Sequence, residues 1–170
     1  YRAWTLALVS LVGTKLTMFK PFRELLIMIF CDFCALSPAQ RKTLLEKFKR
    51  LLQPDGSILL DAYLINAFNQ KTESATYLVS LSDGFWSAGK YYQFLNTFKY
   101  EDVKVTLDKY TIIEENRTRQ IFNWLQYYNK ESIASEFAAS GLKIEKFLAN
   151  VAGDEFDPEG SEFAIIARCN

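Results

Sequence analysis

The fold class follows from the stretch Glu24-Leu-Leu-Ile-Met-Ile-Phe30, which is a continuous apolar run of the length of one strand. A run without polar alternation is typical of a strand in a parallel sheet, where helices cover both faces. A second run of this kind, Ser57-Ile-Leu-Leu-Asp61, lies further along the chain. The sequence therefore predicts an α/β protein in which both segments are buried strands.

A helix is expected between these two strands. Ser37 is suited to cap its start, Pro38 to the first helical position, and Gln40 completes a capping box. Gln53-Pro-Asp-Gly56 is expected to end the helix, and the basic residues within 41–50 to form its solvated face. Strand, helix and strand in this order predict one right-handed βαβ unit.

The middle of the chain has the alternating pattern of a half-exposed antiparallel strand, with apolar residues at Val105 and Leu107. The alternation slips near Asp108–Lys109, which indicates a β-bulge. A turn at 114–117 and a partner strand at 118–125 follow. The interpretation is an antiparallel β-ribbon inserted into the α/β fold.

The end of the chain returns to the α/β pattern. Asn129 is suited to cap a helix that Gly141 ends. Residues 143–149 and 163–168 are expected to be strands separated by a loop. Because no linker or repeat is visible, residues 1–170 are expected to form a single domain.

Composition excludes several classes of function. Twenty basic residues balance twenty acidic ones, so no nucleic-acid partner is expected. The chain has no histidine, which excludes histidine-ligated metal sites and histidine-based triads, and no metal is expected. Its three cysteines fit a reducing compartment and predict a cytoplasmic location. The apolar run at residues 25–30 is too short to span a bilayer, so no membrane association is expected.

Four features, in this order, resemble the class I S-adenosylmethionine-dependent methyltransferases. They are a strand ending in Cys31-Asp-Phe-Cys-Ala-Leu36, a helix ending in Leu51-Leu-Gln-Pro-Asp-Gly56, the strand Ser57–Asp61, and a closing helix with Gly141 and two strands. Family members have a leucine-lysine-proline-glycine-glycine turn after the helix, from which Gln53 and Asp55 depart. The resemblance covers residues 24–170.

The resemblance implies a Rossmann-like, mostly parallel methyltransferase sheet, of which this chain would hold strands four to seven. Strands 24–30, 57–61 and 163–168 should then be adjacent central strands, with 143–149 at the edge and the last strand antiparallel. The family's Gly-x-Gly turn is not visible in residues 1–23, where Gly13 stands alone. The expectation is an N-terminally truncated domain that binds S-adenosylmethionine weakly or not at all.

By the same resemblance, Cys31, Asp32 and Phe33 would edge the methyl donor, because ligands in such sheets bind beyond the carboxyl ends of the strands. The alternative is an ordinary strand end in which Asp32 bonds to a nearby loop. Asp61 ends the next strand, and shaping the cleft and capping a loop are equally good interpretations of it.

Aromatic residues gather in the insertion, about residues 84–128, which by resemblance would form a lid over a small-molecule methyl acceptor. Aromatic faces also suit a sulfonium cation or a flat acceptor. The alternative is that these rings only attach the ribbon to the sheet. The residues assigned to substrate binding are Trp86, Tyr91, Trp124 and Tyr128.

The leading hypothesis is a fragment of a small-molecule methyltransferase, with no catalytic residue assigned because positioning alone accelerates methyl transfer. A non-catalytic methyltransferase-like module is the alternative, and a thiol redox protein using Cys31 and Cys34 is a third hypothesis. The edge of strand 25–30 needs a cover. Residues 5–12 or 15–19 of the chain are one candidate, and a homodimer through this sheet edge is the other.

Overall fold

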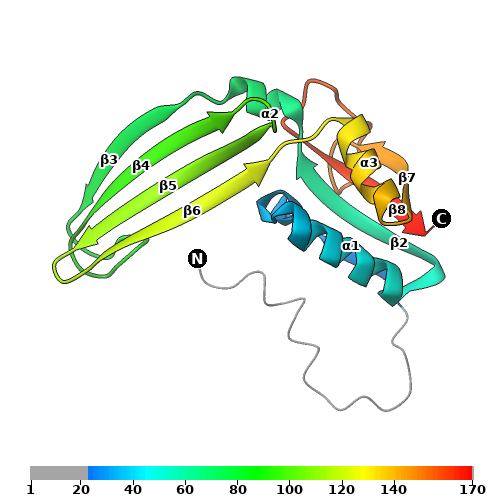
Figure 1. Ribbon diagram of the computed structural model, residues 1–170, viewed down its shortest axis with the longest axis horizontal. Coiled ribbons are helices and arrows are strands. Elements are labelled where there is room, and N and C mark those ends of the chain that lie inside the picture. The colour runs from blue at the N-terminus through cyan, green and yellow to red at the C-terminus, as the bar shows by residue number, and fades with distance from the viewer. Residues whose placement is uncertain (1–22, 170) are drawn as a thin grey trace, which may run out of the picture.

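The computed structural model describes residues 23–169, which form a mixed α/β fold with two four-stranded sheets (Figure 1). The first sheet has the order β1-β2-β8-β7 and the second the order β3-β4-β5-β6. The first sheet and its helices are β1 (Arg23–Met28), η1 (Asp32–Ala35), α1 (Pro38–Leu51), β2 (Leu52–Tyr63), α3 (Lys130–Ala139), β7 (Leu142–Leu148) and β8 (Glu162–Cys169). The remaining elements are α2 (Ile65–Gln70), β3 (Ser74–Ser80), β4 (Tyr91–Tyr100), β5 (Val105–Glu114) and β6 (Thr118–Gln126).

The first sheet has the strand neighbours that the sequence predicted. β1 pairs with β2 in parallel, with Leu26 opposite Ile58, and β8 pairs antiparallel with both β2 and β7. Strands β1, β2 and β7 therefore run in one direction and β8 in the other. The predictions that β1, β2 and β8 are adjacent, that β7 lies at the edge and that the last strand is reversed are confirmed. Within the described residues β1 lies at the other edge and is not central, and only the β1–β2 pairing is parallel.

The core lies on one face of the first sheet, against α1 and α3. In β1, Leu26 and Met28 are buried, whereas Leu25 and Ile27 on the opposite face are about half exposed. Full coverage of both faces of β1, expected from its unbroken apolar run, is therefore not found among residues 23–169. The fully buried core side chains of the first sheet and its helices include Phe33, Leu45, Ile58, Leu60, Ile133, Phe137, Leu142, Phe163 and Ile165.

The start of α1 has the predicted capping box. The Ser37 hydroxyl accepts from the Gln40 N–H, and the Gln40 side chain accepts from the Ser37 N–H. At its other end the helix stops at Leu51 and β2 begins at Leu52, so the Gln53–Gly56 segment belongs to β2 and forms no separate turn. Gly56 is needed there because a Cβ at this position would lie 2.7 Å from the Arg23 carbonyl oxygen.

The second sheet is larger than the two-stranded ribbon that was predicted. It begins at β3 and includes β4, neither of which the sequence interpretation identified. The predicted β-bulge in β5 is wrong, because β5 pairs with β4 and β6 in unbroken register. Lys109, the polar residue that interrupts the alternation, keeps its place in this register opposite Asn96 and Phe122. Its neighbour Asp108 accepts a 2.6 Å hydrogen bond from Thr97 on the adjacent strand.

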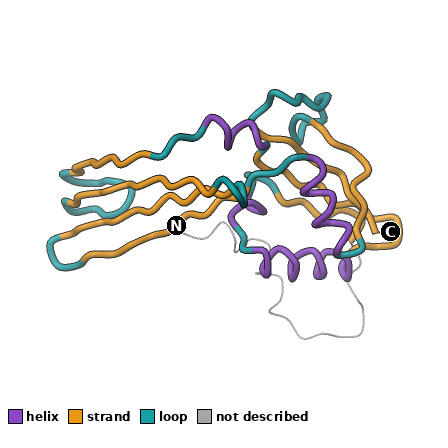
Figure 2. Tube along the Cα trace, turned by 45° about the horizontal axis from the view of Figure 1, so that its top comes forward, coloured by secondary structure: helices purple, strands orange, loops and turns teal. Residues whose placement is uncertain are grey.

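The second sheet projects from the first as a separate lobe (Figure 2). The chain leaves for this lobe after β2 and returns at Tyr128, and the two crossings are joined by backbone hydrogen bonds. The Tyr128 N–H donates to the Tyr63 carbonyl at 3.0 Å, and the Ile65 N–H donates to the Tyr128 carbonyl at 2.8 Å. The outgoing and returning segments therefore lie side by side and connect the lobe to the first sheet at one place, which we call the crossing.

Of the helices between Arg23 and Cys169, none has the length and apolar composition to cross a membrane. The outer edge of β1 has no strand partner within residues 23–169. The segments 5–12 and 15–19, which were candidates to cover it, lie outside the described residues.

Shortening a buried side chain at the centre of the core should lower the free energy of unfolding much more than shortening an exposed side chain in a loop. Ile165 in β8 is fully buried, so Ile165→Ala should lower the free energy of unfolding by about 2–5 kcal/mol. Val151 lies in the loop before β8 and is exposed, so the control Val151→Ala should change it by less than about 0.5 kcal/mol. Urea unfolding followed by circular dichroism measures both, and equal losses would contradict the assignment of the core.

Candidate functional site

A strained turn follows the carboxyl end of β1. Phe30 and Cys31 have φ angles of 72° and 54°, the left-handed region that residues other than glycine seldom adopt. Such a conformation persists only where the surroundings hold it, because it costs about 1 kcal/mol or more per residue. The carboxylate of Asp61 holds it here, accepting the Phe30 N–H at 3.0 Å and the Cys31 N–H at 2.7 Å.

Parallel pairing brings Asp61 to this position. Met28 pairs with Leu60, so the next residue of β2 lies beside the chain that leaves β1. Of the two interpretations of Asp61 from sequence, the structure shows the capping of a loop. That loop is the segment in which the three residues assigned to the donor lie.

The three predicted donor residues are placed differently from one another. The side chains of Cys31 and Phe33 are buried, so only their backbone atoms face this end of the sheet. Asp32 is partly exposed, and burial together with the charge of Asp61 raises its pKa. The most exposed side chain of the turn is Phe30, at 81%. Its positive φ is invisible in the sequence, and Phe30 was not predicted as a site residue.

Carboxylates concentrate at this end of the sheet. Besides Asp32 and Asp61, Glu162 at the start of β8 lies 3.9 Å from the Cys31 sulfur. Among residues 23–169 no group of side chains has the arrangement needed to hold a metal ion. Negative charge concentrated at this edge attracts cationic groups.

The two cysteines of the turn are free and buried. A hydrogen bond to Cys34 and burial raise the pKa of the Cys31 thiol, with Asp61 and Glu162 adding to the effect. The Cys34 sulfur accepts the Tyr63 N–H at 3.3 Å. Both thiols are buried, whereas reactive cysteines are partly exposed, so this arrangement gives no support to thiol redox chemistry.

Tyr128 lies in the core beneath the turn. Its ring packs 6.0 Å from that of Phe33, and its hydroxyl donates to Glu136 of α3 at 3.1 Å. Glu136 also accepts a 2.6 Å ion-pair hydrogen bond from Arg41 of α1. Arg41 is buried, which corrects the expectation that all basic residues within 41–50 are solvated. Tyr128 thus connects the two helices with the turn.

Trp86 and Tyr91 lie at the distal end of the second sheet, far along the chain from the crossing at Tyr128. The Trp86 indole donates to Gln93 at 2.6 Å and packs against Tyr110. Tyr91 is buried beneath Gly84, where a Cβ would collide with the tyrosine ring. Both aromatic residues therefore have structural contacts within the lobe.

Trp124 is separated from the other three predicted substrate residues. It pairs with Leu107 across β5 and β6, near the crossing, and its ring packs against Tyr100. The strand register puts Trp124 on the face of the sheet opposite to Gln93, the partner of Trp86. The structure therefore does not bring Trp86, Tyr91, Trp124 and Tyr128 into one pocket.

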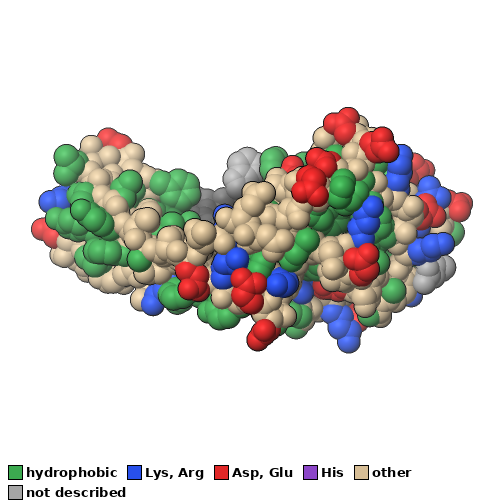
Figure 3. Space-filling view, turned by 90° about the horizontal axis from the view of Figure 1, so that it is seen from above, with side chains coloured by type: hydrophobic (Ala, Val, Ile, Leu, Met, Phe, Trp, Pro, Cys, Tyr) green, Lys and Arg blue, Asp and Glu red, His purple; other side chains and the backbone are tan. Residues whose placement is uncertain are grey.

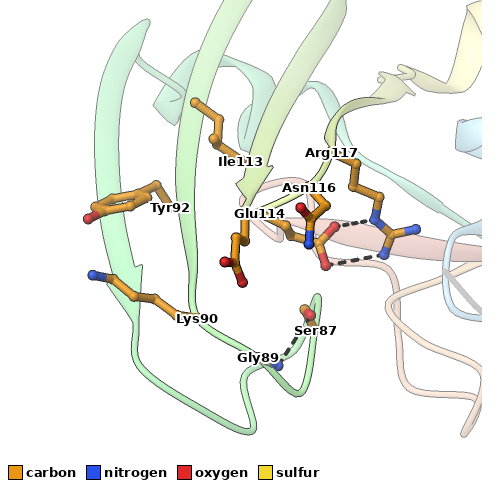
Figure 4. A pocket seen from close by; sticks show the side chains of 9 residues that line it. Ser87, Gly89, Lys90, Tyr92, Ile113, Glu114, Asn116 and Arg117 are labelled. Atoms are coloured by element: carbon orange, nitrogen blue, oxygen red, sulfur yellow. Dashed lines mark hydrogen bonds and ion pairs between the residues drawn. The ribbon is translucent and has the colours of Figure 1, made fainter.

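The distal end also holds an open pocket of about 520 Å³ that was not predicted from the sequence (Figure 4). Arg117 binds Glu114 through two nitrogens, and this hydrogen bonding lowers the pKa of Glu114 to about 2. Lys90 lies over the ring of Tyr92 on the other side. The lining residues are Ser87, Gly89, Lys90, Tyr92, Ile113, Glu114, Glu115, Asn116 and Arg117.

The fold is that of the class I S-adenosylmethionine-dependent methyltransferases, as the sequence resemblance predicted. The chain is similar to the CcbJ methyltransferase of Streptomyces caelestis, with a TM-score of 0.63 and 14% identity over 91% of this chain and 60% of that one. A S-adenosylmethionine-dependent methyltransferase of Clostridium acetobutylicum ATCC 824 also has a TM-score of 0.63, with 8% identity over 91% of this chain and 61% of that one.

A third similar structure is the sugar N-methyltransferase KedS8 of Streptoalloteichus sp ATCC 53650, with a TM-score of 0.54 and 14% identity over 95% of this chain and 66% of that one. The chain thus spans about 60% of the length of the first two of these enzymes. No family model matches the sequence, and no curated protein matches it either. At these identities the likeness establishes the fold alone.

Removing the Asp61 carboxylate should destabilise the turn. Asp61→Ala leaves two N–H groups without their charged acceptor and should lower the free energy of unfolding by about 1.5–3 kcal/mol. Asp61→Asn keeps one acceptor oxygen, so its free energy of unfolding should fall by about half as much. The control Asp102→Ala removes an exposed carboxylate from another turn and should stay within about 0.5 kcal/mol. Chemical denaturation measures the free energy of unfolding of all three variants. If Asp61→Ala leaves it unchanged, the carboxylate does not hold the turn.

Stability should fall at alkaline pH because of the tyrosines near the crossing. Burial raises the pKa of Tyr63 to about 12, and burial also raises the pKa values of Tyr127 and Tyr128. The unfolded chain loses these protons near pH 10, before the folded one does, so stability is full below pH 10 and is lost as pH rises through 12. Urea unfolding at pH 9 and 11 should show a smaller loss in Tyr63→Phe than in the native chain. An equal loss in Tyr63→Phe would contradict the assignment to Tyr63; Tyr77→Phe, at an exposed ring, is the control.

Proposed function

We propose that the protein takes part in methyl transfer from S-adenosylmethionine to a small-molecule acceptor, at the carboxyl ends of β1 and β2. The observation that carries the proposal is the Phe30–Cys31 turn, held by Asp61 at the ends of two parallel strands in a methyltransferase fold. Ligands of open α/β sheets bind at this edge. A fixed, strained turn is the kind of feature that persists at binding sites.

The residues of the turn fit the chemistry of the donor. S-adenosylmethionine supplies an electrophilic methyl group on a sulfonium, and it also carries an ammonium group. The carboxylates of Asp32, Asp61 and Glu162 favour such cations, and the exposed ring of Phe30 offers a face for a sulfonium. Cys31 and Phe33 would contribute through backbone atoms, since their side chains are buried.

This chain's part in catalysis is positioning. Holding two reactants close and aligned can supply much of the acceleration of such a displacement, so no general base is required. Tyr63, with its pKa near 12, stays protonated at neutral pH and does not act as a base. The turn, fixed by Asp61 and supported from below by Phe33 and Tyr128, supplies a rigid wall for the reactants.

Binding of the donor by this chain alone is proposed to be weak. The sequence has no Gly-x-Gly turn, which in the family lets the backbone approach the ligand. The chain also spans only about 60% of CcbJ. Residues that complete the donor site would come from outside this stretch, so that the piece described here belongs to a larger catalytic unit.

The second sheet is proposed to serve the acceptor side. The residues assigned as a lid, 84–128, include most of this sheet and the open pocket beside Lys90 and Arg117. KedS8 is a sugar N-methyltransferase, so an amine on a sugar-like molecule is the first acceptor to test. Trp86 and Trp124 remain candidate acceptor contacts, on different faces of the sheet. A cytoplasmic location, a single domain and a homodimer through the β1 edge stay predictions.

Titration of the ¹⁵N-labelled 170-residue chain with S-adenosylmethionine, followed by NMR, tests the location of the site. Amide signals of Phe30, Asp32 and Asp61 should shift, with a dissociation constant in the millimolar range, about −4 kcal/mol. Asp61→Ala should weaken these shifts, whereas the control Asp102→Ala should not. No shifts at about 10 mM ligand, or shifts confined to the distal pocket, would contradict the proposed donor site. A micromolar dissociation constant with shifts at these amides would support the location of the site and contradict only the proposal that binding is weak.

A further inference from the structure

The second sheet has one face crowded with exposed aromatic side chains. Strand register places these residues on the same side, because Phe94 pairs with Tyr77, Tyr92 with Ile113, and Phe98 with Leu107, which in turn pairs with Trp124. We define the aromatic face by its large members that are 38% to 74% exposed: Tyr77, Val79, Tyr92, Phe94, Phe98, Tyr100, Ile113, Phe122 and Trp124. Hydrophobic side chains gather on the lobe of this sheet in the space-filling view (Figure 3).

The opposite face of the same sheet is covered by the chain itself at both ends, although Leu78 of β3 on that face is 48% exposed. At the distal end Trp86 packs against Tyr110 and bonds to Gln93. At the crossing, Phe68 of α2 packs beneath Lys99, and its ring lies 5.4 Å from that of Tyr127. Among residues 23–169 no helix or loop of this kind covers the aromatic face. The asymmetry makes the aromatic face the unpartnered side of the sheet.

Charge is almost absent from this face. Within its four strands, all of which are described, Lys109 at the centre of β5 is the one charged side chain of this face, and there is no carboxylate. At the distal end Lys90, just before β4, also lies over the ring of Tyr92. Interface cores are likewise depleted in charge and enriched in aromatic residues. An anionic membrane surface would require a cluster of basic residues instead. The hollow on this face is the open pocket at its distal end, beside Tyr92 and Ile113, and it leaves the rings around Phe94, Phe98 and Trp124 uncovered.

The size of the face suits a protein partner. Four strands about 4.8 Å apart, each about ten residues of 3.3 Å, cover roughly 600 Å². Two such faces together would bury roughly 1,200 Å², which is the lower bound for a stable interface, and the protruding rings add to it. Two sheets pack face to face at about 10 Å, the distance that interdigitating rings fill.

We propose that the aromatic face is the interface of a homodimer, in which the second sheets of two copies pack face to face. An isologous interface sets the same patch against itself, so a face that is apolar throughout is self-complementary. The lobe projects from the α/β part, so an antiparallel arrangement puts the two α/β parts at opposite ends (Figure 2). In this arrangement Trp124, on the half of the face nearer the crossing, packs against Phe94 of the other copy, which lies on the half nearer the distal end.

Sedimentation equilibrium of the complete chain tests this proposal. The monomer mass is 19.6 kDa, and the native chain should sediment with twice this mass at micromolar concentration. Phe94→Thr with Phe98→Thr keeps β-forming residues but removes two central rings, and should weaken the dimer about a hundredfold. Val151→Thr, at an exposed apolar residue outside the second sheet, is the control and should leave the mass unchanged. Circular dichroism verifies that each variant is folded.

A second set of variants separates this interface from others. Leu25→Thr with Ile27→Thr alters β1, where the alternative sheet-edge dimer would form, and should leave the mass unchanged. A dimer that the β1 variant dissociates and the Phe94 and Phe98 variant does not would overturn the proposal. A native chain that is monomeric at about 100 µM would do the same. So would a chain that dimerises only after residues 1–22 are removed, because the face would then belong to this chain's own N-terminal segment.

Discussion

The carboxylate of Asp61 is the contact on which the end of the first sheet depends. Parallel pairing of β1 and β2 carries it to the place where the chain leaves β1, and there it accepts two successive backbone N–H groups. Without those bonds the left-handed conformation of Phe30 and Cys31 would have nothing to offset its cost. The position of Asp32 and the burial of Cys31 and Phe33 follow from this turn. One side chain on β2 therefore fixes the conformation of the loop that follows β1.

The sequence predicted the first sheet well because its signals are local and repeated. The unbroken apolar run before Phe30, the capping box at Ser37 and the cap at Asn129 each specify one element through short-range chemistry. Strand order and the reversed last strand came from resemblance to a family and were confirmed. The turn itself could not be predicted, because nothing in the letters Phe30 and Cys31 signals a positive φ.

The second sheet was predicted only in part for a different reason. β5 and β6 alternate apolar and polar residues around a tight turn, which is a recognisable pattern. β4 has large aromatic residues on one face and polar residues such as Gln93 and Thr97 on the other, yet the exposed face is the aromatic one. Resemblance to a family with a substrate lid in this region led Trp86, Tyr91, Trp124 and Tyr128 to be assigned to substrate binding together. The register instead distributes them over two faces and the core.

The second lobe is a continuous insertion that begins and ends at the crossing at Tyr128. The chain departs after Tyr63 and returns at Tyr128, and two backbone hydrogen bonds clasp these points together. The two ends of this segment are held next to each other by backbone hydrogen bonds. The segment can therefore lengthen, shorten or be replaced without moving the strands of the first sheet. The length and sequence of this lobe can therefore change while the turn at Asp61 is kept intact.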